Sequence, residues 1–245
     1  MAQKKSLLRR LVWSLLGLVA VCIAISVGVV GLLRWINPPY TAFMAQTQMA
    51  AWTKRDHTYV FRHHWVDLSR ISPNLPLAVV ASEDQKFPEH WGFDVEAIEK
   101  AYELNQHSHH VHGASTISQQ VAKNLFLWSG RSYFRKGLEA YFTVLIEAFW
   151  PKRRILEIYL NIAEFGHGTY GAEAAAQRFF HKPAAILSRS DSAVLAAVLP
   201  NPQLLSAAAP SAYVQKRRDW ILGQMQALGG AEMLDDIDVY PNRRR

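Results

Sequence analysis

Cysteine is nearly absent from this chain of 245 residues, and its single example, Cys22, lies in a long apolar run. One cysteine cannot form an intramolecular disulfide. This says nothing about compartment, because an exported domain need not carry disulfides. Internal repeats and low-complexity linkers are also lacking, and few segments alternate apolar and polar residues. We therefore expect one mainly α-helical domain beside the apolar run.

Acidic residues are scarcer than basic ones, and the imbalance is uneven. Of 27 cations, four (Lys4, Lys5, Arg9 and Arg10) lie in the first ten residues, where there is no acid, which leaves 23 cations against 20 acids in the rest of the chain. Three more cations close the chain at 243–245. The remaining chain is close to neutral, so bulk attraction to nucleic acid is not indicated, and no nucleic-acid partner is expected.

Residues 11–33 contain no charge over 23 residues, which is enough to cross a bilayer. A cleavable signal peptide has a shorter apolar core, and a buried core helix is not normally flanked by cations. We therefore predict an uncleaved transmembrane anchor. Four cations precede the run and only Arg34 follows it directly, which favours a cytoplasmic N-terminus and an extracytoplasmic remainder.

Apolar residues at helical spacing recur through the rest of the chain, and Pro73 and Pro76 are expected to bracket a turn. Helices are predicted at Val95–Tyr102, Phe134–Phe149, Lys152–Asn161, Tyr170–Phe180, Ser190–Leu199 and Ala212–Leu228.

An acidic cluster follows the apolar run at 77–81: Glu83, Asp84, Gln85, Lys86 and Phe87, and then His90, Gly92 and Asp94. Carboxylates beside apolar surface are suited to acid–base catalysis. A helix start or a solvated turn has the same composition, so the cluster alone leaves both interpretations open.

Two polar segments follow. Residues 113–124 collect hydroxyls, amides and a lysine at Ser115, Thr116, Gln119, Gln120, Lys123 and Asn124. Ser115 or Thr116 could simply cap a helix, but an uncharged polar face with one cation also suits a sugar or a phosphate. Further on, Arg135 and Glu139 are four residues apart, which fits either a helix salt bridge or a phosphate-binding patch with an enclosed acid.

In this order, these segments resemble the five motifs of the peptidoglycan glycosyltransferases (glycosyltransferase family 51). The motif-like segments are Glu83–Phe87 with His90, Gly92 and Asp94; Gly113–Asn124; Arg135-Lys136 with Glu139; Ile155–Asn161; and Gly168–Gly171 with Ala174, Ala175, Phe179 and Phe180. Five motifs in register are far more specific than one. No Ser-x-x-Lys or Lys-Thr-Gly is present, so the chain is similar to the monofunctional members of the family.

The resemblance implies a lysozyme-like glycosyltransferase domain that polymerises lipid II by inverting attack of a sugar hydroxyl on a lipid-pyrophosphate-linked sugar. Glu83 matches the catalytic base and Glu139 the second essential acid. The implied substrate-binding residues are Asp84, Lys86, Ser115, Thr116, Gln119, Gln120, Lys123, Asn124, Arg131, Arg135 and Lys136. Glu157 and Asn161 look structural.

The resemblance also implies a divalent cation, Mg²⁺ or Mn²⁺, at the pyrophosphate, with Glu139 as a candidate ligand. Expected partners are lipid II, the lipid-linked glycan and the bilayer. Cell-wall synthesis or division proteins are further candidate partners. The implied organisation is a cytoplasmic segment 1–10, an anchor 11–33 in the cytoplasmic (inner) membrane, a juxtamembrane region 34–74, a periplasmic catalytic domain 75–230 and a tail 231–245. The segment 125–128 is suited either to the lipid interface or to core packing.

Two other functions remain open: a membrane-bound lytic transglycosylase or muramidase, and a non-catalytic scaffold of cell-wall assembly. The first needs no pyrophosphate-binding cations, and the second does not need the pair Glu83 and Glu139. The histidines 107, 109, 110 and 112 invite a metal assignment, but their spacing is more typical of a loop.

Removal of residues 1–33 should weaken the use of bilayer-embedded substrate more than it alters folding, because the substrate is held in the membrane. Polymerisation on lipid II vesicles, compared with thermal unfolding of the truncated and full chains, checks this. Equal activity of both forms on vesicles would contradict the anchoring role.

Overall fold

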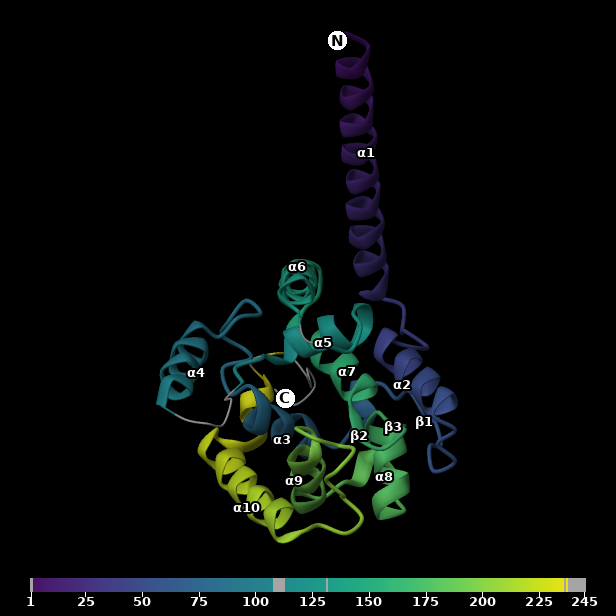
Figure 1. Ribbon diagram of the computed structural model, residues 1–245. Coiled ribbons are helices and arrows are strands. Elements are labelled where there is room, and N and C mark those ends of the chain that lie inside the picture. The colour runs from purple at the N-terminus through teal and green to yellow at the C-terminus, as the bar shows by residue number, and fades with distance from the viewer. Residues whose placement is uncertain (1, 108–112, 131, 236, 238–245) are drawn as a thin grey trace. The chain divides into compact units, whose positions relative to one another are not determined.

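The computed structural model describes residues 2–107, 113–130, 132–235 and 237 (Figure 1). The chain forms two compact units, residues 1–38 and residues 39–245. The first unit is dominated by α1 (Ala2–Leu33). Its segment Arg9–Leu33 is long and apolar enough to cross a membrane by length and composition. The prediction of one N-terminal membrane-spanning candidate is confirmed.

The second unit is mainly helical, as predicted. Its elements are α2 (Ala42–Thr53), β1 (Arg62–His63), η1 (Leu68–Arg70), α3 (Asn74–Glu83), α4 (Val95–His107), α5 (Ile117–Phe126), α6 (Tyr133–Phe149), α7 (Lys152–Ile162), β2 (Glu164–Gly166), β3 (Thr169–Tyr170), α8 (Ala172–Phe180), η2 (Ala184–Ile186), α9 (Arg189–Val198), α10 (Ala212–Ala227) and η3 (Gly230–Asp235).

Helix α3 is the centre of the core. Its residues 75–81 are all buried, and α9 and α10 pack against it (Figure 1). A helix that is apolar on every side is stable only when other elements surround it. The last residue of this buried helix is Glu83, so the core fixes the position of that carboxylate.

The turn predicted between Pro73 and Pro76 is wrong. Pro73 is the N-cap of α3, and Pro76 lies in the first turn of the helix. The first N–H groups of a helix have no acceptor within the helix, so a proline there loses no hydrogen bond. The two prolines therefore start α3 rather than break the chain before it.

A small sheet of order β1-β3-β2 borders the helices, with β1 parallel and β2 antiparallel to β3. Tyr170, expected as the start of a helix, pairs with His63 in this sheet, and α8 begins two residues later. The remaining predicted helices are present with ends shifted by a few residues. The strands escaped prediction because two or three residues are too few to show alternation.

Helix α7 carries the fourth motif-like segment and ties the core to the chain before α3. Glu157 Oε1 accepts a hydrogen bond from the Leu68 amide at 3.0 Å, and Asn161 bonds both backbone groups of Val66 at 2.9 Å. Glu157 also pairs with Arg154 at 2.8 Å. These contacts agree with the structural role expected for Glu157 and Asn161.

Residues 125–128 were expected either to pack in the core or to contact the lipid interface, and different residues of the segment fit each expectation. Leu125 and Leu127 are buried, Phe126 stacks on Phe142 with 4.4 Å between ring centroids, and Trp128 is 44% exposed. Core packing therefore accounts for the two leucines and the phenylalanine, and only Trp128 remains available to a lipid interface.

Gly171, before α8, has φ +86° and ψ 157°, and a Cβ there would lie 2.7 Å from the Asn161 carbonyl oxygen. Gly171→Ala should lower the free energy of unfolding by at least about 2 kcal/mol through backbone strain and this clash. Gly137→Ala, in α6 where a Cβ meets nothing within 4 Å, is the control and should be neutral or slightly stabilising. Equal denaturation midpoints for both variants would contradict the packing at Gly171.

Candidate active site

Two cavities that share Gly113 and Ser115 bring the predicted site residues together. The first, of about 240 Å³, is lined by Glu83, Asp84 and Thr116. The second, of about 910 Å³, is lined by Gln119, Gln120, Lys123, Arg135, Lys136 and Glu139. A third cavity, of about 270 Å³, shares Gln120 and Lys123 with the second and includes Asn124. The fold thus gathers residues that are up to 56 positions apart in the sequence.

Glu83 presents a carboxylate held from two sides. Its Oε2 accepts a hydrogen bond from Gln120 Nε2 at 3.0 Å, and its Oε1 accepts one from Ser82 Oγ at 3.1 Å. Gln120 is held in turn, because its Oε1 accepts a hydrogen bond from the Tyr159 hydroxyl at 3.1 Å. The amide of Gln120 is therefore oriented with its nitrogen toward Glu83.

Tyr159 keeps its proton in this arrangement. Complete burial raises the pKa of its hydroxyl, and the nearby charges of Glu83 and Asp84 raise that pKa further. A protonated hydroxyl can donate to Gln120, so the chain Tyr159–Gln120–Glu83 has one consistent direction of donation.

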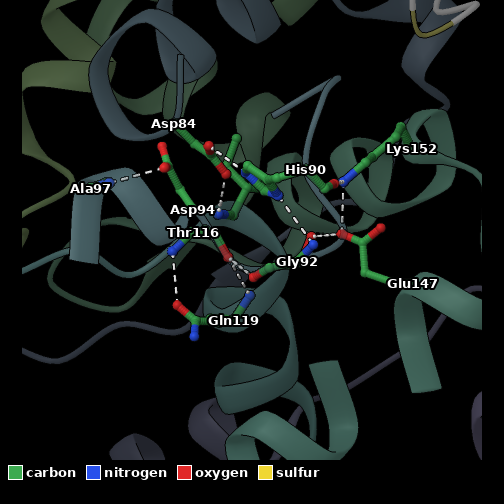
Figure 2. A network of polar contacts seen from close by, with 11 residues as sticks. Asp84, His90, Gly92, Asp94, Ala97, Thr116, Gln119, Glu147 and Lys152 are labelled. Carbon is green, nitrogen blue, oxygen red and sulfur yellow. Dashed lines mark hydrogen bonds and ion pairs between the residues drawn. The ribbon is translucent and has the colours of Figure 1, made fainter. Parts of the chain in front are cut away.

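Asp84 has a different environment from its neighbour Glu83 (Figure 2). Its side chain is 2% exposed, its Oδ1 lies 2.8 Å from His90 Nε2, and its Oδ2 accepts the Ile117 amide at 2.9 Å. Gly92 donates its N–H to His90 Nδ1 at 3.1 Å, so the ring proton lies on Nε2 and points to Asp84. Both carboxylate oxygens are thus already engaged.

The N-terminus of α5 is fixed by a capping box. Thr116 Oγ1 accepts a hydrogen bond from the Gln119 amide, and Gln119 Oε1 accepts one from the Thr116 amide. The Thr116 hydroxyl also donates to the Gly92 carbonyl at 2.7 Å. This arrangement fixes the start of the helix that carries Gln120 and Lys123, so both side chains reach the cavities.

Gly92 sits between these elements with φ +80°. A Cβ at this position would lie 2.6 Å from Thr143 Cγ2 and 3.0 Å from Glu147 Cγ. Glu147 accepts hydrogen bonds from Ser118 at 2.5 Å and Lys152 at 2.8 Å, and Lys152 also bonds the His90 carbonyl (Figure 2). Only glycine allows the chain to pass this close to α6.

Glu139 is buried and lies within a cationic cluster. Its two oxygens contact Arg135 Nη1 at 3.0 Å and Lys136 Nζ at 2.5 Å. The buried Arg135 Nε has no hydrogen-bond partner among the residues that the structure describes. The salt bridge between Arg135 and Glu139 is therefore present, and it lies within a cluster of cations.

Lys123 adds a third cation to this cluster. Burial lowers the pKa of its ammonium, and the charges of Arg135 and Lys136 lower it further, whereas Glu139 raises it. Three cations around one carboxylate leave an excess of positive charge in the lining of this cavity, which favours an anionic ligand.

Other predicted residues lie elsewhere. Lys86 forms an ion pair with Glu96 of α4 and lines none of the three cavities. Arg131 lies outside the described residues, as do histidines 109, 110 and 112 and the side chain of His107.

Comparison with known proteins decides the family. A family model described as transglycosylase matches residues 49–226. The chain belongs to the transglycosylase family. A biosynthetic peptidoglycan transglycosylase of Salmonella schwarzengrund (strain CVM19633) is 54% identical over 228 residues, 93% of each chain. Proteins of the same name from Klebsiella oxytoca and Escherichia coli are 55% and 59% identical over 88% and 78% of this chain, and 90% and 80% of theirs. The resemblance inferred from the motifs is confirmed.

Among the described residues, the site contains no preformed set of metal ligands. Within residues 2–107, 113–130, 132–235 and 237, no group of three or more His, Cys, Asp or Glu side chains could hold a metal ion. Both oxygens of Glu139, the candidate ligand, already contact cations. The described side chains therefore do not fit a resident divalent cation, and the predicted Mg²⁺ or Mn²⁺ would need the phosphate oxygens of its substrate as further ligands.

Two side chains at the site of this transglycosylase were not predicted as site residues from the sequence. Tyr159 lies in a motif-like helix, where its polar end among apolar neighbours was the available signal. Arg217 lies 3.6 Å from Glu83 Oε1 and comes from α10. No local pattern marks it, because a run of charged residues at 216–219 has the composition of a solvated helix face.

Asp84→Ala should lower the free energy of unfolding by about 2–4 kcal/mol, because it leaves the His90 N–H and the Ile117 amide without acceptors. Asp94→Ala is the control, since that carboxylate accepts one hydrogen bond, from the Ala97 amide at 2.9 Å, and its loss should cost only about 1 kcal/mol. Urea denaturation of both variants measures the difference. An Asp84→Ala variant as stable as Asp94→Ala would contradict the stabilising contribution of the Asp84 hydrogen bonds to His90 and Ile117.

Proposed function

We propose that this transglycosylase is a peptidoglycan glycosyltransferase that polymerises lipid II into glycan strands, with Glu83 as the general base. The observation that carries the proposal is that two cavities with different linings meet at Gly113 and Ser115. A hydrogen-bonded carboxylate lines one cavity, and an excess of cations lines the next. The choice of peptidoglycan as the polymer rests on the names of the relatives, which are biosynthetic peptidoglycan transglycosylases.

The reaction needs a proton acceptor for the attacking hydroxyl. In our proposal the acceptor sugar enters beside Glu83, whose carboxylate takes the hydroxyl proton while the oxygen attacks the anomeric carbon of the donor. The hydrogen bonds from Gln120 and Ser82 orient the carboxylate. The new glycosidic bond forms on the face opposite the leaving group, so the configuration inverts.

The leaving group needs compensation for its charge. The bond from the anomeric carbon to the lipid pyrophosphate breaks, and the electron pair stays on the pyrophosphate oxygen. Lys123, Arg135 and Lys136 surround the cavity in which we place this anion, and Arg131 is the further cation predicted there. Glu139 holds Arg135 and Lys136 in position, so we assign it the orientation of these cations.

The remaining predicted contacts divide into two groups. Ser115, Gln119, Gln120 and Asn124 line the cavities and are proposed sugar or phosphate contacts. Asp84 and Thr116 line the first cavity as well, but both are hydrogen-bonded within the protein, and we propose that they position α3 and α5. A divalent cation, if supplied with the substrate, would neutralise further charge on the pyrophosphate.

The membrane setting belongs to the same proposal. The N-terminal helix suits a single-pass anchor. The charge imbalance around it favours a cytoplasmic N-terminus and a periplasmic catalytic unit at the inner membrane, where a lipid-linked substrate is accessible.

The lytic enzyme is the second candidate for this site. A hydrolase that cleaves finished glycan releases no pyrophosphate, so the cluster of Lys123, Arg135 and Lys136 favours the polymerase instead. Purified full-length protein given lipid II with Mg²⁺, and separately mature peptidoglycan, separates the two. Long strands from lipid II support the polymerase, fragments of mature wall support the lytic enzyme, and no product from either supports a scaffold.

Glu83→Gln should abolish strand formation from lipid II, by at least about a hundredfold, because the amide cannot accept the hydroxyl proton. Its fold should survive, since an amide retains an oxygen that accepts the hydrogen bond from Ser82 or Gln120. Product sizing and thermal unfolding of the same preparation check both statements. Substantial polymerisation by this variant would rule out Glu83 as the base.

A further inference from the structure

Glu83 has a contact that the five motif-like segments do not supply. On the side away from Gln120, Arg217 of α10 places its Nη2 3.6 Å from Glu83 Oε1. The same nitrogen donates a hydrogen bond to Ser82 Oγ at 3.1 Å, and Ser82 donates to Glu83 Oε1 at 3.1 Å. Arg217 thus reaches the carboxylate both directly and through the serine hydroxyl.

This pair differs from an ordinary surface salt bridge. The side chains of Arg217 and Glu83 are only 24% and 13% exposed. Exposed pairs contribute little because water and salt screen them, whereas partly buried charges are screened much less. The helices are also joined by a second hydrogen bond, from Gln85 Nε2 to Gln224 Oε1 at 3.0 Å, which holds α10 at the end of α3.

The other charged groups near Glu83 act from a greater distance or carry no positive charge. Lys123 of α5 and the protonated Tyr159 of α7 sense Glu83 electrostatically, and Asp84 is its negative neighbour. Of the remaining elements packed on α3, α9 carries Arg189 and Asp191, and η3 carries Glu232 and Asp235. Among the described residues, Arg217 is the cation in ion-pair contact with Glu83.

We propose that Arg217 is a positioning residue for the general base, which holds the Glu83 carboxylate oriented toward the acceptor hydroxyl. This inference rests on the proposed role of Glu83. The bond through Ser82 restricts rotation of the carboxylate, which leaves the oxygens in a geometry suited to proton transfer.

The test measures strand formation by the full-length protein on fluorescent lipid II in detergent, over a range of lipid II concentrations. Arg217→Met should lower kcat about tenfold, with KM changed less than about twofold, because the residue does not contact substrate. Arg217→Lys, which keeps a charged donor at this position, should recover part of the lost kcat.

Arg218→Met is the matched control, because that neighbouring side chain pairs with Asp219. It should leave kcat and KM unchanged. If Arg217→Met proves unfolded by thermal denaturation, Arg217→Gln against Arg217→Lys gives the same comparison, with the larger loss of kcat in the glutamine variant.

A folded Arg217→Met or Arg217→Gln whose kcat equals that of the unmodified enzyme would overturn the role of Arg217. Equal losses of kcat in the lysine and glutamine variants would overturn it as well, because the charged contact would not be the cause. Activity retained by Glu83→Gln would instead overturn the base assignment itself, so the two failures are distinguishable.

Discussion

The geometry of the site depends on the buried carboxylate of Asp84. It joins three segments: the end of α3, which it caps, the start of α5 through the Ile117 amide, and the loop at His90. A buried carboxylate is stable only when its oxygens are engaged, and here both are. As a result, the preceding residue, Glu83, is directed at Gln120 with little freedom.

Adjacent acids in the sequence therefore have separate tasks for a physical reason. The end of a helix points successive side chains in different directions, so Glu83 lines the cavity while Asp84 turns into the protein. In the proposed mechanism, Glu83 acts as the base while Asp84 holds the surrounding segments in place. Gly92 is part of the same arrangement, because a residue with a Cβ at this position would clash with α6.

In the cationic cluster, too, one buried carboxylate holds other side chains in position. Glu139 is surrounded by Lys123, Arg135 and Lys136, which come from two helices that pack together. A single acid cannot neutralise three cations. It can nevertheless hold two of them still, which leaves their remaining donors ready for an anion without the cost of reorganisation. The pKa of Lys123 is lowered because its ammonium is buried and lies beside the charges of Arg135 and Lys136.

The sequence by itself determined the transmembrane candidate, the positions of most helices and the family, and it predicted which acids and cations form the site. These follow from apolar periodicity and from motif order, both of which are local. The tertiary structure decided the rest. It placed Pro76 inside a helix, it separated Lys86 from the cavities by an ion pair with Glu96, and it brought Arg217 to Glu83 across 134 positions of the chain. Such pairings depend on which helices pack together, and no local pattern in a sequence encodes that choice.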